Sequence, residues 1–138
     1  MKRKLISWTF ALLAFVSGVA LAQGFPSRPL KIIVPFPPGG GTDVAARALA
    51  EHLGREFGQP VVVDNRPGGN SIIATEAVAR SAPDGYTLLL TTDFHSINAA
   101  SGIRLPYDSL KDFTFIAQVS TSPLMLVAHP SVPLKTLA

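Results

Sequence analysis

The sequence predicts an α/β fold with a mainly parallel β-sheet. Short apolar runs at Leu30–Phe36, Val61–Val63 and Tyr86–Leu90 are typical of strands that are covered on both faces. Helical patterns separate these runs, and the connecting loops are short. Alternation of this kind predicts parallel strands with right-handed crossovers. The loops that follow the strands then project from one edge of the sheet, where open α/β sheets bind their ligands.

The first 22 residues are typical of a secretory signal peptide. The basic residues Lys2, Arg3 and Lys4 precede an apolar stretch, and Ala20 and Ala22 form the Ala-x-Ala arrangement that signal peptidase accepts. We expect cleavage after residue 22, which leaves residues 23–138 as the exported part. An uncleaved membrane anchor is the alternative, because the apolar stretch is nearly long enough to span a bilayer.

The composition of the exported part excludes several classes of function. Three of the twelve Lys and Arg residues belong to the signal segment, so nine basic side chains remain against nine acidic ones. No basic cluster remains that would favour nucleic acid. The chain has no cysteine, which excludes disulfides and thiolate metal sites. His52, His95 and His129 are too far apart along the chain for a metal-binding motif, so we expect no metal.

The first strand leads through a glycine-rich loop into a predicted helix. The helix is expected to begin with Thr42 as its N-cap, and Gly58 is a typical C-terminal stop. Asp43 suits the positive end of the helix dipole. The pattern predicts an inward-facing stripe formed by Ala45, Ala48, Leu49, Leu53 and Phe57.

The strand and helix pattern then repeats. Val61–Val63 leads into a second glycine-bearing loop, and Ser71–Arg80 follows as a helix with Ile73, Ala74, Ala77 and Val78 facing inward. A third strand, Tyr86–Leu90, leads to the polar loop Thr91–Ser96. Beyond an irregular connection at residues 105–113, strands are expected at 115–119 and 124–128, and a helix begins at 134–138.

The loop Phe36–Asp43 has three possible roles. A phosphate loop needs Lys and Ser or Thr after the last glycine, and Thr42-Asp43 stands there instead. A dinucleotide fingerprint fits in part, although Val44 occupies the third-glycine position and its branched side chain is expected to obstruct helix–strand packing. The remaining role is to hold a small anion on backbone N–H groups, unless the glycines only form a tight turn. Asp43 would repel such an anion unless its side chain turns away or binds through water.

The second and third loops favour binding over catalysis. Arg66–Ser71 is again a glycine-bearing turn into a helix N-terminus, although Ser71 could be only an N-cap and Arg66 only a surface charge. His95 lies in a cluster with Thr91, Thr92 and Ser96, and a lone His in such a loop is usually structural. These donors are not accompanied by a Ser-His-acid arrangement or by a pair of carboxylates placed for acid–base catalysis. We therefore expect no enzyme activity and no catalytic residues.

These motifs resemble those of a known family, the Bug-type periplasmic solute-binding proteins of tripartite tricarboxylate transporters. The resemblance extends from about Phe25 to the last residue. The motifs that support it are Pro26-Ser27-Arg28-Pro29, Val34-Pro35-Phe36-Pro37-Pro38-Gly39-Gly40-Gly41-Thr42-Asp43, Gly58-Gln59-Pro60-Val61-Val62-Val63-Asp64-Asn65-Arg66-Pro67-Gly68, Ala82-Pro83-Asp84-Gly85-Tyr86-Thr87-Leu88-Leu89 and Leu105-Pro106-Tyr107-Asp108.

The resemblance implies a periplasmic, two-lobed receptor of the type II, Venus-flytrap class that needs no cofactor. Its ligand would be a di- or tricarboxylate, an acidic amino acid or an aromatic acid, and its partner a two-component membrane permease. In the family, the loops after the first two strands hold the carboxylate, partly through ordered water. Carried over by position, the ligand-binding residues are Phe36, Pro38, Gly39, Gly40, Gly41, Thr42, Asp43, Gly68, Gly69, Asn70, Ser71, Ile72, Ala74, Thr91, Asp93 and His95.

Two departures from the family pattern affect these expectations. Many relatives have Pro-Gly-Ala-Gly-Gly where this chain has Pro67-Gly68-Gly69-Asn70-Ser71, so the second loop could select a different acid. The chain is also short, and residues 23–138 are expected to form most of a truncated first lobe and the start of the crossover to the second. Such a chain should bind carboxylates weakly and be poorly stable. A ligand-presenting receptor for a membrane sensor and, less favoured, a dinucleotide-binding enzyme fragment remain as alternatives.

Overall fold

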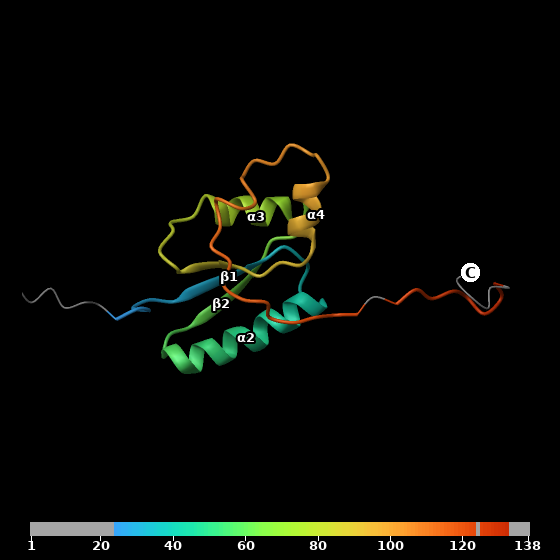
Figure 1. The fold of residues 1–138 in the computed structure, drawn as a ribbon. Helices are drawn as coiled ribbons and strands as arrows, with labels where there is room; N and C mark the ends of the chain where they lie inside the picture. Colours follow the sequence, from blue (N-terminus) through green and yellow to red (C-terminus); the bar gives the residue numbers. More distant parts are fainter. Residues whose placement is uncertain (1–23, 124, 133–138) are drawn as a thin grey trace, which may run out of the picture.

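A computed structural model describes residues 24–123 and 125–132. A three-stranded sheet lies between two helical layers, with α2 on one face and α3 and α4 on the other (Figure 1). The elements are β1 (Leu30–Val34), α2 (Gly41–Phe57), β2 (Val61–Asn65), the short 3₁₀ turn η1 (Gly69–Ser71), α3 (Ile72–Ala79), β3 (Thr87–Leu89) and α4 (Phe94–Ala100). The predicted signal peptide and the helix expected from residue 134 lie outside the described residues.

The sheet has the strand order β2-β1-β3, and both pairings are parallel. Ile32, in the middle of β1, pairs with Val63 of β2 and Leu88 of β3. Because β1 is central, its apolar side chains are covered on both faces, and Ile32 and Val34 are fully buried. The predicted α/β class and the three predicted strands are confirmed.

Helix α2 packs on the sheet through its smallest side chains. Ala46 and Ala50 join Ile32 and Val34 in the core, with Leu49 at the margin. The predicted inward stripe was wrong in part, because Ala48 is exposed and Phe57 is 39% exposed. The two alanines, with no bulky side chain in the way, face the strands directly. The helix ends after Phe57 at Gly58, which has a φ of 62°, as the sequence predicted.

Helix α3 covers the opposite face with Ala74 and Thr75, which are both fully buried. The hydroxyl of Thr75 donates a hydrogen bond of 2.8 Å to the carbonyl of Ser71. Ile73 was predicted to face inward, but its side chain is exposed. It lies instead beside the second glycine loop, with Cδ1 2.9 Å from the position that a Cβ on Gly68 would occupy.

The segment after β3 differs most from the sequence-based expectation. Phe94–Ala100 forms α4 where only a polar loop was predicted. The strands expected at 115–119 and 124–128 are absent from the described residues, and Phe115 and Leu126 are 66% and 82% exposed. Strand-like sequence forms a strand only where another strand pairs with it. This segment passes the sheet without pairing, and its last described residues run away from the sheet (Figure 1). Among the described helices, none is long and apolar enough to cross a membrane.

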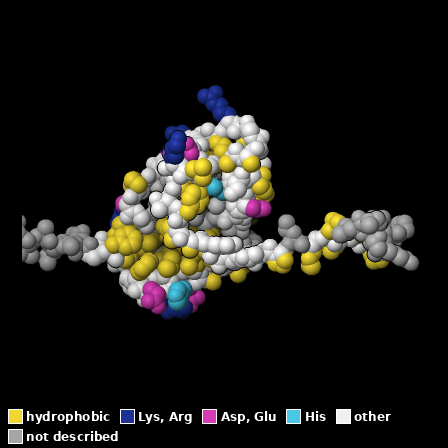
Figure 2. Space-filling model, viewed as in Figure 1, with side chains coloured by type: hydrophobic (Ala, Val, Ile, Leu, Met, Phe, Trp, Pro, Cys, Tyr) yellow, Lys and Arg dark blue, Asp and Glu magenta, His cyan; other side chains and the backbone are white. Residues whose placement is uncertain are grey.

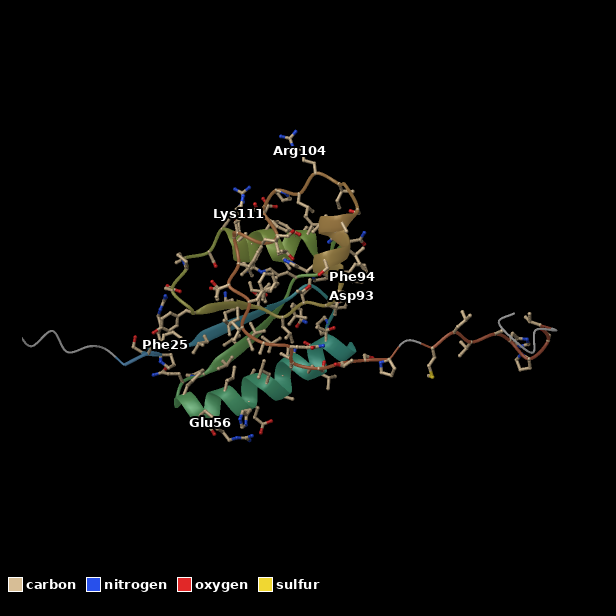
Figure 3. The ribbon with its side chains drawn as sticks, in the orientation of Figure 1. Phe25, Glu56, Asp93, Phe94, Arg104 and Lys111 are labelled. Carbon is tan, nitrogen blue, oxygen red and sulfur yellow. The ribbon has the colours of Figure 1, made fainter. Side chains whose placement is uncertain are left out.

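The amino end of the sheet is closed by an aromatic and charged cluster. The Phe25 ring meets the rings of Phe57 and Tyr86 edge to face. Arg28 lies over the Tyr86 ring at 4.2 Å and forms an ion pair of 2.7 Å with Asp84. Hydrophobic side chains gather on the surface at this end, above α2 (Figure 2). Phe25 lies at the opposite end of the molecule from Asp93 and Phe94 (Figure 3).

Candidate functional site

The carboxyl ends of the three strands form one edge, because all three strands are parallel. Backbone hydrogen bonds continue from the strands into two of the loops that follow. The N–H of Arg66 donates to the carbonyl of Val34 at 2.8 Å, and the N–H of Leu90 donates to that of Ile33 at 3.0 Å. The loops that start after Val34, Asn65 and Leu89 therefore emerge side by side, as predicted.

Asp43 fastens the first loop to the rest of this edge. Its carboxylate is almost fully buried and accepts hydrogen bonds of 2.9 Å from Arg47 Nε, the Gly39 N–H and the Asn65 amide. These donors, Arg47 first, then Gly39 and Asn65, lower the pKa of Asp43 to about 2. The side chain therefore turns into the protein, and its charge is compensated by protein groups rather than aimed at the loop's outer surface.

Asn65, the last residue of β2, reinforces the same attachment. Its amide also donates to the carbonyl of Phe36 at 3.0 Å, and its Oδ1 accepts from Arg47 at 3.3 Å. Asn65 and Arg47 were missed in the sequence analysis. The spacing of Asp43 and Arg47, four residues apart on one helix, was an available signal for their ion pair.

The glycine loop itself is open to solvent. Pro38 and Gly39–Gly41 are exposed, and Gly39 has a φ of 86°, which favours glycine. The predicted N-cap was wrong: α2 begins at Gly41, Gly40 is its cap, and no side chain caps the helix, with Thr42 half-buried inside the first turn. Val44 is 60% exposed, so it does not obstruct packing against the sheet, and that part of the argument against a dinucleotide was also wrong.

The second loop has an unusual backbone. Gly68, Gly69, Asn70 and Ser71 have successive positive φ values of 129°, 55°, 49° and 70°. Ser71 stands at the N-cap position of α3, as the alternative to a binding role held, but its side chain makes no cap hydrogen bond. Ser71 is only 2% exposed, and its hydroxyl has no partner within the protein. Buried hydroxyls normally have a partner, so this oxygen is a candidate for contact with water or a ligand.

The second loop borders α3, whose first residues were also predicted to bind. Ile72 is half-buried at the start of the helix, whereas Ala74 is fully buried. Arg66 lies just before this loop and bonds to Asp64, with its NH2 group at 2.9 Å from the carboxylate. Its charge is therefore paired at the surface, which agrees with the alternative that Arg66 is a surface charge.

The third loop carries the polar residues Thr91 and Asp93, and His95 follows them in the interior. The hydroxyl of Thr91 is buried without a partner, and Asp93 is exposed immediately before α4. His95 is buried within α4: its Nε2–H donates to the carbonyl of Ser109 at 2.9 Å, and its ring stacks on Tyr107. His95 is thus engaged in packing, in agreement with the structural role that lone histidines usually have.

Helix α4 touches both of the other loops. The Phe94 ring lies 6.1 Å from the Phe36 ring in the first loop. One turn later, Asn98 Nδ2 donates to the carbonyl of Asn70 in the second loop at 2.7 Å. Asp93 and Phe94 lie together where α4 begins (Figure 3). Phe94 and Asn98 were not among the predicted ligand-binding residues, because the helix that carries them was not predicted.

Two further features bear on what this edge can do. The described residues contain no group of three or more His, Asp or Glu side chains that could hold a metal ion. A shallow depression of about 660 Å³ lies elsewhere, between α2 and the outer side of β2, and includes Arg55, Gln59 and Val61 in its lining. The carboxyl edge thus offers backbone N–H groups and hydroxyls rather than metal ligands.

The sequence itself matches a known family. A sequence model of the tripartite tricarboxylate transporter family receptor (TctC) matches residues 45–138. The chain belongs to this family. Protein BugT of Bordetella pertussis is 46% identical over 132 residues, which cover 93% of this chain and 40% of BugT. The chain spans about 40% of the length of BugT and of a second curated relative from the same organism.

Two solved structures share the fold of the part of the chain that they match. MatC from Rhodopseudomonas palustris, solved with bound malate, is 38% identical with a TM-score of 0.60, and the match covers 65% of this chain and 31% of MatC. A structure described as a periplasmic transporter is 43% identical with a TM-score of 0.59, over 63% of this chain and 30% of the other. The resemblance to Bug-type receptors is therefore confirmed. The family consists of periplasmic binding proteins rather than enzymes.

Proposed function

We propose that this TctC-family chain supplies one wall of the ligand site of a periplasmic receptor for a small carboxylate. The observation that carries the proposal is the convergence of three loops that offer donors without a matching acceptor. Gly40 and Gly41 are exposed at the start of α2, next to Gly39, whose N–H is already bonded to Asp43. The hydroxyls of Ser71 and Thr91 are buried without protein partners. Such donors suit a carboxylate oxygen, directly or through water.

The charges at this edge favour a ligand whose head group is held by neutral donors. Arg47 pairs with Asp43 and Arg66 pairs with Asp64, so both guanidinium groups already have carboxylate partners. Asp43, in turn, is enclosed by its own donors and does not oppose an incoming anion. The relative MatC was solved with malate, which supports a small dicarboxylate as the first ligand to test.

The remaining assignments follow from the same proposal. The ligand-contacting residues are the exposed or unpartnered members of the predicted set, with Asp43, Ala74 and His95 acting through the protein interior. Residues 1–22 direct export as a signal peptide and are then cleaved off. The receptor delivers its ligand to a two-component membrane permease. Delivery to a membrane sensor is the second candidate, because both partners would read the same ligand-bound state.

Amide NMR of the chain purified from the periplasm tests the proposal. Titration with malate, citrate, glutamate and benzoate should shift amides in three regions: residues 36–42, 68–72 and 91–93. Because one wall holds the ligand, we expect a Kd no tighter than about 1 mM. Ser71→Ala should weaken the response, while Ser96→Ala, an exposed serine in α4, serves as the control. Shifts confined to other regions, or a matching response to chloride at equal ionic strength, would refute it.

A thermal-shift assay tests the alternative that the chain is part of a dinucleotide-binding enzyme. Stabilisation of the chain by NAD but not by carboxylates in this assay would favour the dinucleotide-binding alternative.

Mass spectrometry of the exported protein tests signal-peptide cleavage and should find Gln23 at its N-terminus. An intact N-terminus in the membrane fraction would instead favour the uncleaved anchor.

A further inference from the structure

We infer that Asn98 is a positioning residue for the carboxyl edge: it holds the left-handed segment, Gly68–Ser71, in the conformation that presents the Ser71 hydroxyl. The binding part of this inference rests on the proposed function, whereas the conformational part can be measured without any ligand. The inference starts from an unfavourable backbone. Asn70 and Ser71 both have positive φ values, which side chains with a Cβ rarely adopt.

Two side-chain hydrogen bonds reach successive carbonyls of the left-handed segment, in addition to the backbone bond from the Ile72 N–H to the Gly69 carbonyl. Thr75, one turn into α3, donates to the Ser71 carbonyl at 2.8 Å. Asn98 donates to the Asn70 carbonyl at 2.7 Å, and its side chain arrives from a helix 28 residues away in the sequence. Thr75 moves with the segment because both belong to the same helix start. Asn98 is therefore the contact that fixes the segment relative to the rest of the protein.

The surroundings of Asn98 make this contact firm. Asn98 is only 3% exposed. Loss of its amide would leave the Asn70 carbonyl without this donor. Helix α4 is itself fixed, because His95 donates to the Ser109 carbonyl and Phe94 lies against Phe36. The position of α4 is thus transmitted to the second loop through one side chain.

Loss of the Asn98 amide would change the geometry of the proposed ligand site rather than the packing of the core. Asn98 does not belong to the core cluster formed by Ile32, Val34, Ala46 and Ala50. Without its amide, Asn70 and Ser71 can relax toward negative φ, which carries the Ser71 hydroxyl and the first N–H groups of α3 away from their present directions. Asn98 thus acts on the ligand through the left-handed segment, without a contact of its own.

The test compares Asn98→Ala with Ser96→Ala in the same helix, in the 138-residue chain. Three-bond HN–Hα couplings and Cα and Cβ chemical shifts report φ at Asn70 and Ser71. We expect Asn98→Ala to abolish the positive-φ signature at both residues and to weaken malate binding about tenfold, whereas Ser96→Ala should leave both unchanged. The melting temperature should fall too little to explain the loss of binding.

A rescue separates positioning from general destabilisation. Glycine adopts positive φ without strain, so Asn70→Gly in the Asn98→Ala background should recover at least half of the lost affinity. Asn98→Asp, which keeps the size of the side chain but replaces the donor with a carboxylate oxygen, decides the conformational question if Asn98→Ala fails to fold. Persistence of positive φ at Asn70 and Ser71 in Asn98→Ala or in Asn98→Asp would overturn the inference. If the unmodified chain binds no carboxylate, the proposed function fails, while the φ measurement still decides the role of Asn98.

Discussion

The two ends of the sheet are built on opposite principles. At the amino end, Phe25, Arg28 and Tyr86 form contacts that satisfy one another, and the Tyr86 oxygen accepts from the Ser27 N–H at 2.8 Å. At the carboxyl end, two buried hydroxyls lack partners and four successive residues have positive φ. Unfavourable backbone and unpaired polar groups concentrate at functional sites, where a ligand can complete them. The unfavourable backbone and the unpaired hydroxyls thus lie at the carboxyl end, where we propose that the ligand binds.

A glycine at each end gives the largest expected difference. Gly68 has φ 129° and ψ 157°, a region open essentially to glycine alone, and a Cβ there would lie 2.9 Å from Ile73 Cδ1. Gly85 has a φ of 81°, and its Cβ would meet the Phe25 ring at 3.3 Å. We expect Gly68→Ala to lower the free energy of unfolding by about 3 kcal/mol and Gly85→Ala by roughly 1–2 kcal/mol, both measured by urea denaturation.

The control for this pair is the partner side chain. Ile73→Ala alone should cost little, because Ile73 is exposed, and it should relieve part of the loss in Gly68→Ala. A larger loss at Gly85 than at Gly68 would reverse the comparison between the two ends.

Asp43→Asn should have the next largest effect, with a defined pH dependence. The pKa of Asp43 is lowered from 3.8 to about 2 in the folded protein, so the folded state favours the ionised carboxylate. Its contribution to stability is complete above the unfolded pKa and is lost as the pH falls through the folded pKa. The wild-type chain should therefore be more stable than the variant at neutral pH, and the difference should shrink between about pH 4 and about pH 2. Circular dichroism melts at several pH values measure this, and a difference that does not change with pH would contradict it.

The two tyrosines provide the mildest test, because each reports on one end. Hydrogen bonds from Ser27 lower the pKa of Tyr86 at the amino end, whereas burial raises the pKa of Tyr107 beside α4. Ultraviolet titration should therefore show two separate ionisation steps, with Tyr86 first. Tyr86→Phe should remove the earlier step and reduce stability only slightly. Loss of the later step in this variant would mean that the two tyrosines are assigned the wrong way round.

The elements that the sequence predicted well are those whose determinants are local. The apolar runs of β1 and β2 and the Gly58 stop of α2 need no information from distant residues. The parallel pairing followed from the alternation of strands and helices. The glycine loops were likewise located correctly, because glycine and proline mark turns directly.

The parts that were missed depend on contacts between distant residues. Helix α4 has seven residues, and His95 and Asn98 on it are held by Ser109 and Asn70, which no local pattern reveals. The inward turn of the Asp43 carboxylate was one of two open alternatives, and its cause was missed, because Asn65 lies 22 residues away and supplies one of the donors. The apolar run at 115–119 has strand-like composition, yet no strand pairs with it in the described part of the chain.

The position of α4 between two loops has a consequence for how the proposed ligand site could acquire new ligands. Phe94 meets Phe36 in one loop, and Asn98 meets Asn70 in the other, so both loops share a single support. Substitutions in loops that share a support are not independent in their effects. A change in ligand preference that begins in the glycine loop would alter which substitutions the second loop tolerates. Evolution or laboratory selection would therefore reach different ligands according to the order in which the two loops changed.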